Sequence, residues 1–194
     1  MTGLDLVYRR DDDGVLHYRD AWTTPDAVMR HTGKVGHIGA LRPRRTKDAA
    51  AAKQALAEFA AESEALGFAP FPEDDRAWVV LQYWAVTPDF SHVQDARIMS
   101  DLWDALSGHL LRRGLGDCDG YDVGGHPENP DHARYVKVNW FCPVVDADLG
   151  VAAVRGFIRA FHVGSSAVIG VRPTQDADYE LAYSPRKSDT GFWI

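Results

Sequence analysis

Cysteine is scarce in this chain of 194 residues, which contains only Cys118 and Cys142. Two cysteines cannot supply the several cross-links that hold together small, disulfide-dense secreted domains. The first residues, Met1–Arg10, lack the apolar core of a signal peptide, and no apolar run approaches the ~20 residues needed to span a bilayer. The sequence therefore predicts a cytoplasmic protein with no membrane segment and with both thiols reduced.

Motifs of catalysis are missing as well. The chain has no phosphate-cradling glycine loop, no nucleophile elbow and no helical His-Glu-x-x-His. A nucleophilic cysteine would need a neighbouring base, and His126 and His132 are near Cys118 only in the sequence. We therefore expect no catalytic residues and no cofactor.

The turn-rich stretch 117–132 offers oxygen ligands of the kind that hard cations take. It lacks the full calcium-loop spacing with its terminal bidentate Glu, and its two histidines are too loosely placed for a zinc site. We expect a solvated acidic loop with no bound metal. The residues concerned are Asp117, Asp119, Asp122, Glu128 and Asp131, with His126 and His132. A hairpin turn near 124–134 would also bring Cys118 and Cys142 together on adjacent strands.

Positive charge is concentrated in one segment of an acidic chain. The formal net charge is −7, but Val28–Leu56 holds seven Lys or Arg and one acid, so this segment is +6 and the remainder is −13. Such a patch can bind a partner of opposite charge locally; the plainer alternative is a solvated basic edge. The candidate nucleic-acid-binding residues are Arg30, Lys34, Arg42, Arg44, Arg45 and Lys47.

The first third is predicted to form strands followed by one helix. Leu4–Arg10 and Val15–Trp22 flank a strong turn signal, Asp11-Asp12-Asp13-Gly14. Val28–His31 and Lys34–Leu41 are expected to form a second hairpin around a group of glycines. A helix is expected over Asp48–Leu66, because it opens on an alanine run and then carries one apolar stripe.

The glycines stand in the sequence His31-Thr32-Gly33-Lys34-Val35-Gly36-His37-Ile38-Gly39. With the surrounding strands and helix, residues 5–68 resemble a WGR domain, a module found beside the catalytic region of some poly(ADP-ribose) polymerases. The family core is Trp-Gly-Arg-x-Gly-x-x-Gly, and here Thr32 replaces the Trp and Lys34 the Arg. The resemblance implies a small antiparallel sheet with one helix. The aromatic ring and the guanidinium implicated in contacting a DNA end are absent.

The second half alternates strands with helices in the order β-α-β-β-α-β plus one more strand. This order predicts an α+β protein whose second domain is a ferredoxin-like split βαβ sandwich, with both helices on one face of an antiparallel sheet. We expect a WGR-like module at 1–68, a linker at 69–76 that contains two prolines and three acids, and the ferredoxin-like domain at 77–194. The aromatic residues Phe192 and Trp193 of the C-terminal tail are expected to dock on that domain.

These features favour a non-catalytic binding or adaptor protein that acts through protein contacts with an unknown partner. One version is an immunity or antitoxin-type protein whose acidic surface covers a basic partner. A second class is a nucleic-acid-binding module that uses the basic hairpin. A third is an enzyme with its site in the ferredoxin-like half, using the acidic loop and a metal.

Overall fold

The chain is α+β, with one antiparallel sheet in each of two compact units. The computed structural model describes residues 3–87, 89–124, 136–164 and 166–194. Unit 1 comprises Met1–Pro72 with Arg112–Gly114, and unit 2 comprises Glu73–Leu111 with Leu115–Ile194. The boundary between the two units follows Pro72 and therefore falls inside the predicted linker at 69–76. No described helix combines the length and the apolar character that a membrane crossing requires.

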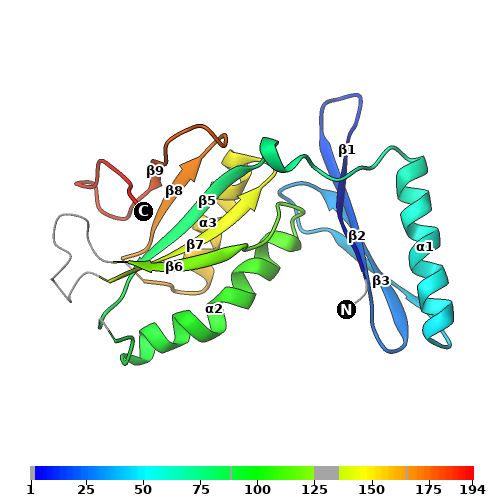
Figure 1. Cartoon of the computed structure of the whole chain (residues 1–194), viewed down its shortest axis with the longest axis horizontal. Helices are drawn as coiled ribbons and strands as arrows, with labels where there is room; N and C mark the ends of the chain where they lie inside the picture. Colours follow the sequence, from blue (N-terminus) through cyan, green and yellow to red (C-terminus); the bar gives the residue numbers. More distant parts are fainter. Residues whose placement is uncertain (1–2, 88, 125–135, 165) are drawn as a thin grey trace. The chain divides into compact units, whose positions relative to one another are not determined.

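Unit 1 is a four-stranded sheet with one helix against it (Figure 1). The strands follow one another in space as they do in the chain: β1 Gly3–Arg10, β2 Leu16–Thr23, β3 Ala27–Lys34 and β4 Ala40–Arg45. The helix α1, Ala49–Ala65, starts at Asp48, whose carboxylate accepts a hydrogen bond of 2.7 Å from the Ala51 amide. Leu56 and Phe59 of α1 pack with Val28 of the sheet, as the apolar stripe predicts.

The hairpin around the glycines differs from the prediction. The strand β3 continues from Ala27 to Lys34, and the following strand begins at Ala40 rather than at Lys34. The turn therefore occupies 35–39, because Lys34 still pairs with His17 of β2. Consequently Arg42, Arg44 and Arg45 lie on the edge strand β4 itself and not beyond it.

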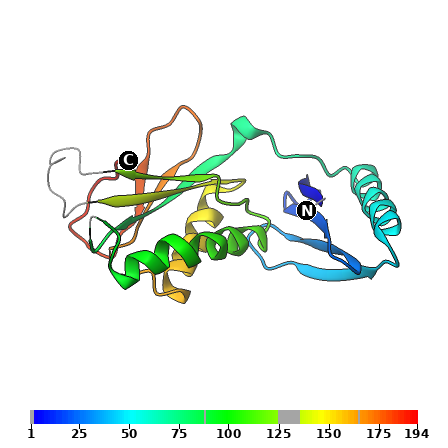
Figure 2. The same ribbon diagram turned by 60° about the horizontal axis from the view of Figure 1, so that its bottom comes forward.

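Unit 2 has the strand order β6-β7-β5-β8-β9, with every neighbouring pair antiparallel. The first four strands have the ferredoxin-like order that the sequence predicts, and β9 extends one edge. The helices α2 and α3 lie on the same face of this sheet (Figures 1 and 2). The elements are a 3-10 turn at Glu73–Asp75, β5 Ala77–Trp84, α2 Val93–Leu111, β6 Gly120–Gly124, β7 Lys137–Val144, α3 Ala147–Ala160, β8 Val168–Arg172 and β9 Glu180–Tyr183.

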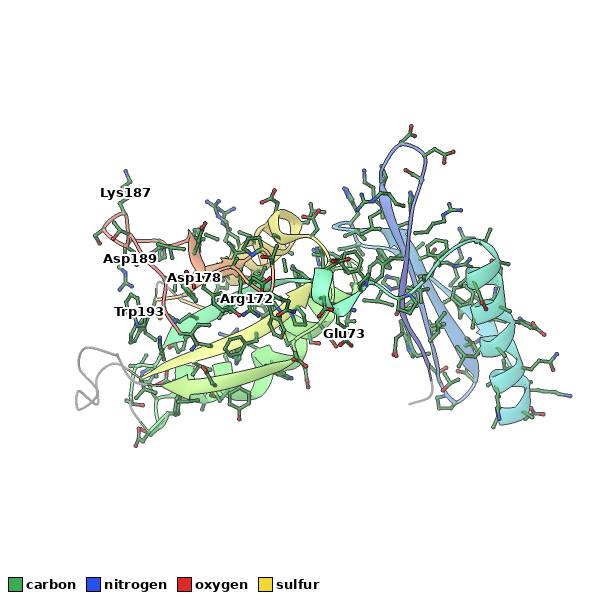
Figure 3. All side chains as sticks on the ribbon, turned by 45° about the horizontal axis from the view of Figure 1, so that its top comes forward. Glu73, Arg172, Asp178, Lys187, Asp189 and Trp193 are labelled. Carbon is green, nitrogen blue, oxygen red and sulfur yellow. The ribbon has the colours of Figure 1, made fainter. Side chains whose placement is uncertain are left out.

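The core of unit 2 lies between the sheet and its two helices. Val79, Leu81 and Trp140 on the sheet are buried, as are Leu106 of α2 and Phe157 of α3. The opposite face of the sheet has no described helix against it, but the C-terminal tail lies there. The predicted docking of the tail is confirmed: the Phe192 ring lies over Gly170, and the Trp193 carbonyl accepts hydrogen bonds from side chains of β5 and β7. Figure 3 labels Trp193 in the tail.

Candidate binding surfaces

Three of the six candidate basic residues are engaged inside unit 1. The Arg44 guanidinium donates to Glu58 of α1 at 2.6 Å, and Arg45 forms an ion pair with Asp26. Hydrogen bonds from Arg44 and Gln54 lower the pKa of Glu58. The half-buried Arg30 lies over the Phe59 ring, 5.3 Å from its centroid. Groups of the protein itself partly neutralise or cover these cations, which weakens their electrostatic attraction for a polyanion.

The other three candidates, Lys34, Arg42 and Lys47, are exposed, and their side chains have no hydrogen-bond or ion-pair partner among the described residues. Lys34 is the last residue of β3, Arg42 lies in β4 and Lys47 follows that strand. Two large apolar side chains share this edge: Ile38 is 67% exposed and Leu41 is 49% exposed. We call the segment 34–47 the β4 edge. It therefore combines unmatched positive charge with exposed apolar surface.

A shallow hollow of about 330 Å³ lies where β4 leads into α1. It is lined by Arg44, Arg45, Thr46, Lys47, Ala51, Gln54 and Ala55. Cations beside a helix start can hold a phosphate. Here, however, the Asp48 carboxylate already lies at the helix start, and Arg44 and Arg45 are paired with acids. An added anion would have to compete with all three carboxylates, so this hollow is poorly suited to phosphate.

The three glycines of the turn region have packing roles. Gly36 has φ +86°, the left-handed conformation that favours glycine. A Cβ at Gly33 would come within 2.8 Å of the Tyr18 ring, and one at Gly39 would overlap the Tyr18 hydroxyl. Gly33 and Gly39 are thus explained inside unit 1 by their close approach to one tyrosine, and Gly36 by its left-handed backbone.

That tyrosine belongs to a buried polar network. The Tyr18 hydroxyl oxygen lies 3.1 Å from Nε2 of His31, and Nδ1 of His31 lies 2.7 Å from Oδ1 of Asp20. Burial, with the nearby Asp20 charge, raises the pKa of Tyr18 to about 12. Tyr18 is fully buried and His31 is 4% exposed. The network therefore links β2 to β3 through side chains in the interior of unit 1.

The acidic stretch is only partly described. Asp117 and Asp119 precede β6 and Asp122 lies in the middle of it, whereas His126, Glu128, Asp131 and His132 fall outside the described residues. Within the described ranges, no three His, Cys, Asp or Glu side chains are grouped closely enough to hold a metal ion. The expectation of a solvated loop without metal therefore stays a prediction.

The two cysteines lie side by side, as the hairpin interpretation predicts. Their Sγ atoms are 3.4 Å apart and both thiols are free. The hydrogen bond with Cys118, together with burial, raises the pKa of the Cys142 thiol. A protonated thiol is a poorer nucleophile than a thiolate, and Cys142 is also fully buried.

We expect this difference to be visible in thiol chemistry. Iodoacetamide forms a thioether that a neighbouring thiol cannot displace. It should alkylate the half-buried Cys118 slowly in the native chain and Cys142 only after denaturation. Cys118→Ser should make the native chain unreactive while leaving one reactive thiol in guanidinium. A wild-type chain that shows no thiol even when denatured, until a reductant is added, would contradict the reduced state.

Unit 2 contains a row of buried polar side chains that the sequence did not predict. Lys137 and Asn139 are each 1% exposed and Gln82 is 2% exposed, although all three point away from the helices. Asn139 donates to Asp122 at 2.6 Å and accepts from Gln82 at 2.8 Å. The alternation in β7 places Lys137 and Asn139 on one face, and the Trp193 carbonyl of the tail contacts Lys137 on that face.

No protein-family model, curated protein or solved structure matches this chain.

Proposed function

We propose that this chain is a non-catalytic binding protein that acts through protein contacts, and that the β4 edge is its contact surface. The observation that carries this proposal is that one edge of the sheet carries the exposed apolar side chains Ile38 and Leu41 and the unmatched cations Lys34, Arg42 and Lys47. As neighbours in a strand, Leu41 and Arg42 face opposite sides of the sheet, so a partner would have to hold the edge from both sides. Protein interfaces combine an apolar centre with a charged rim, and Arg is enriched in them. The partner surface that fits is apolar at its centre and acidic around it.

Nucleic-acid binding fits the same edge less well. A duplex offers a line of phosphates that binds through several cations, but Arg44 and Arg45 already pair with Glu58 and Asp26. Phosphates also gain nothing from an exposed Ile38. The position of the WGR tryptophan holds Thr32, which has no ring on which a base or sugar could stack.

The two units differ in net charge, so a basic partner and an acidic partner would bind to different units. Unit 2 carries 18 acidic and 9 basic side chains, a formal net charge of −9, whereas unit 1 carries 10 acidic and 12 basic side chains, a net charge of +2. An immunity or antitoxin-type role, in which acidic surface covers a basic partner, would use unit 2. The β4 edge instead suits an acidic partner.

The test compares the full chain with its Ile38→Asp/Leu41→Asp variant. Both side chains are exposed, so the fold should tolerate the change, and the new carboxylates should repel an acidic partner. Val93→Asp is the matched control, since Val93 is 78% exposed at the start of α2. In quantitative capture from a lysate, we expect a protein that wild type and control retain and that the double variant loses at least tenfold.

Other outcomes overturn the proposal. Capture that the double variant retains would exclude the β4 edge, and dependence on acidic residues of unit 2 would favour the immunity-type role. Salt-dependent binding of wild type to duplex DNA, flattened by Arg42→Glu/Lys47→Glu, would establish the nucleic-acid alternative.

A further inference from the structure

The face of the unit 2 sheet opposite its two helices holds a buried cation, Lys137, and the C-terminal tail lies against it. The register of β5 against β7 places Gln82 opposite Asn139 and Trp84 opposite Lys137, on the face away from α2 and α3. Burying a lysine ammonium costs free energy unless its donors find acceptors. Burial lowers the pKa of Lys137, and the nearby Asp122 charge opposes that shift.

The acceptor that Lys137 finds belongs to the backbone of the tail. Its Nζ donates to the Trp193 carbonyl at 2.8 Å, and Nε2 of Gln82 donates to the same oxygen at 2.9 Å. The ammonium also lies 5.3 Å from the centroid of the Trp193 ring, within range of a cation–π interaction. Two side chains of the sheet therefore recognise one main-chain carbonyl and the aromatic ring beside it.

Aromatic contacts complete the arrangement. The Trp193 ring lies 6.3 Å from that of Trp84, and the Phe192 ring lies 6.1 Å from that of Tyr179. Phe192 covers Gly170, where a Cβ would overlap the ring. Because Gly170 has no side chain, the surface of β8 is flat at this position and a phenyl ring can pack on it. Figure 3 shows the tail ending at this sheet, with Trp193 labelled.

The tail is held by contacts of its Trp193 carbonyl and its two rings and not by strand pairing. Residues 184–194 form no strand, and Trp193 keeps 38% and Ile194 keeps 44% of its surface exposed. If the tail only stabilised the fold, apolar side chains on the sheet and on the tail would do so equally well. A buried charge is often neutral or unfavourable for the free energy of folding. A lysine and an amide that hydrogen-bond to a backbone oxygen, beside places for two rings, are instead the parts of a peptide-binding site.

We propose that this face, centred on Lys137, Gln82 and Trp84, is a binding site for an extended segment of a partner protein that carries adjacent aromatic residues, and that the tail is its intramolecular competitor. The chemistry of that segment is set by what the tail presents: a phenyl ring, a second aromatic ring and the carbonyl that follows. A tethered competitor acts at an effective concentration of up to about millimolar. The partner segment therefore gains access when the tail is released.

The experiment uses the full chain with Phe192→Ala/Trp193→Ala, in which the site stays intact and the tail lacks its anchors. The probe is a fluorescein-labelled peptide of sequence Ser-Asp-Thr-Gly-Phe-Trp-Ile, identical to 188–194. By fluorescence anisotropy we expect this variant to bind the peptide at least tenfold more tightly than wild type does. The same peptide with Ala at both aromatic positions should not bind to either protein.

A site substitution locates the binding. Lys137→Met added to the tail variant should weaken peptide binding at least tenfold, and Gln82→Leu serves the same purpose if the Lys137 variant does not fold. Circular dichroism verifies the fold in each case. A phage-displayed peptide library selected on the tail variant should return segments with adjacent aromatic residues.

Three results would overturn the proposal. A folded tail variant that binds the peptide no better than wild type would make the tail a structural cover only. Binding that survives loss of both Lys137 and Gln82 would place the peptide elsewhere. A wild-type dimer that the tail variant abolishes would identify the occupant as the tail of a second copy. None of these results bears on the β4 edge, which lies in unit 1.

Discussion

Asp95→Ala is expected to destabilise unit 2 by about 3–5 kcal/mol, because it leaves several buried donors without an acceptor. The Asp95 side chain is buried, and its carboxylate accepts from the Tyr83 hydroxyl at 2.9 Å and from the Val86 and Thr87 amides at 2.9 Å each. This carboxylate joins the start of α2 to the segment that leaves β5. Its removal should loosen both elements together.

The effect should depend on pH. Burial opposes ionisation of Asp95, but the hydrogen bonds from Val86, Thr87 and Tyr83 outweigh it and hold the pKa below its ordinary value of 3.8. A carboxyl with a lowered pKa stabilises the fold fully above that ordinary value and loses its contribution as the pH falls through the folded-state pKa. The difference between wild type and Asp95→Ala should therefore shrink below about pH 4.

Urea unfolding followed by tryptophan fluorescence measures this effect, and hydrogen exchange assigns the transition to unit 2. Asp104→Ala on the exposed side of the same helix is the matched control and should stay within about 0.5 kcal/mol of wild type. A loss of less than about 1 kcal/mol for Asp95→Ala at pH 7 would show that water replaces the carboxylate at little cost.

Local patterns were sufficient to predict most of the fold. The apolar run at Trp78–Val86 predicts a strand covered on both sides, and β5 is the central strand of its sheet. The alternation over Tyr135–Cys142 predicts β7. Together with the two helices, these strands fix a ferredoxin-like order because right-handed crossovers leave few alternatives.

The candidate sites depend on contacts that periodicity does not contain. The basic residues were visible as a cluster, but the pairing of Arg44 with Glu58 and of Arg45 with Asp26 joins residues from different elements. Likewise, alternation places Lys137 on one face of β7 without indicating that residues near the C-terminus return to cover it. Long-range polar partners are set by tertiary packing, for which a single sequence has no local signal.

Gly39→Ala is expected to destabilise unit 1 by about 2–4 kcal/mol, because the added methyl group overpacks a buried site and disturbs its hydrogen bonds. The new Cβ would overlap the Tyr18 hydroxyl and come within 2.6 Å of Nε2 of His31 and 2.7 Å of the Thr32 carbonyl oxygen. The carbonyl belongs to the backbone of β3 and cannot turn aside. Hydrogen exchange of β2 and β3 should therefore accelerate in the variant.

Gly156→Ala in α3 is the control for the chemical change itself. Nothing lies within 4 Å of a Cβ at this position, and alanine in a helix interior should stabilise the chain by about 0.5–1 kcal/mol. A double-mutant cycle then isolates the cause. In a Tyr18→Phe background, where the hydroxyl is gone, the cost of Gly39→Ala should fall by about 1 kcal/mol or more.

The double-mutant cycle also tests whether the glycines serve packing inside unit 1 or contact with a partner. Strong coupling between Gly39 and Tyr18 would mean that the spacing shared with WGR domains serves the packing of the turn on β2. A Gly39→Ala chain of unchanged stability that no longer retains its partner would instead place the turn backbone in contact with that partner. The first result leaves the exposed side chains of the β4 edge as the part of this hairpin that is open to binding, because Gly33 and Gly39 face the buried network of Tyr18, His31 and Asp20.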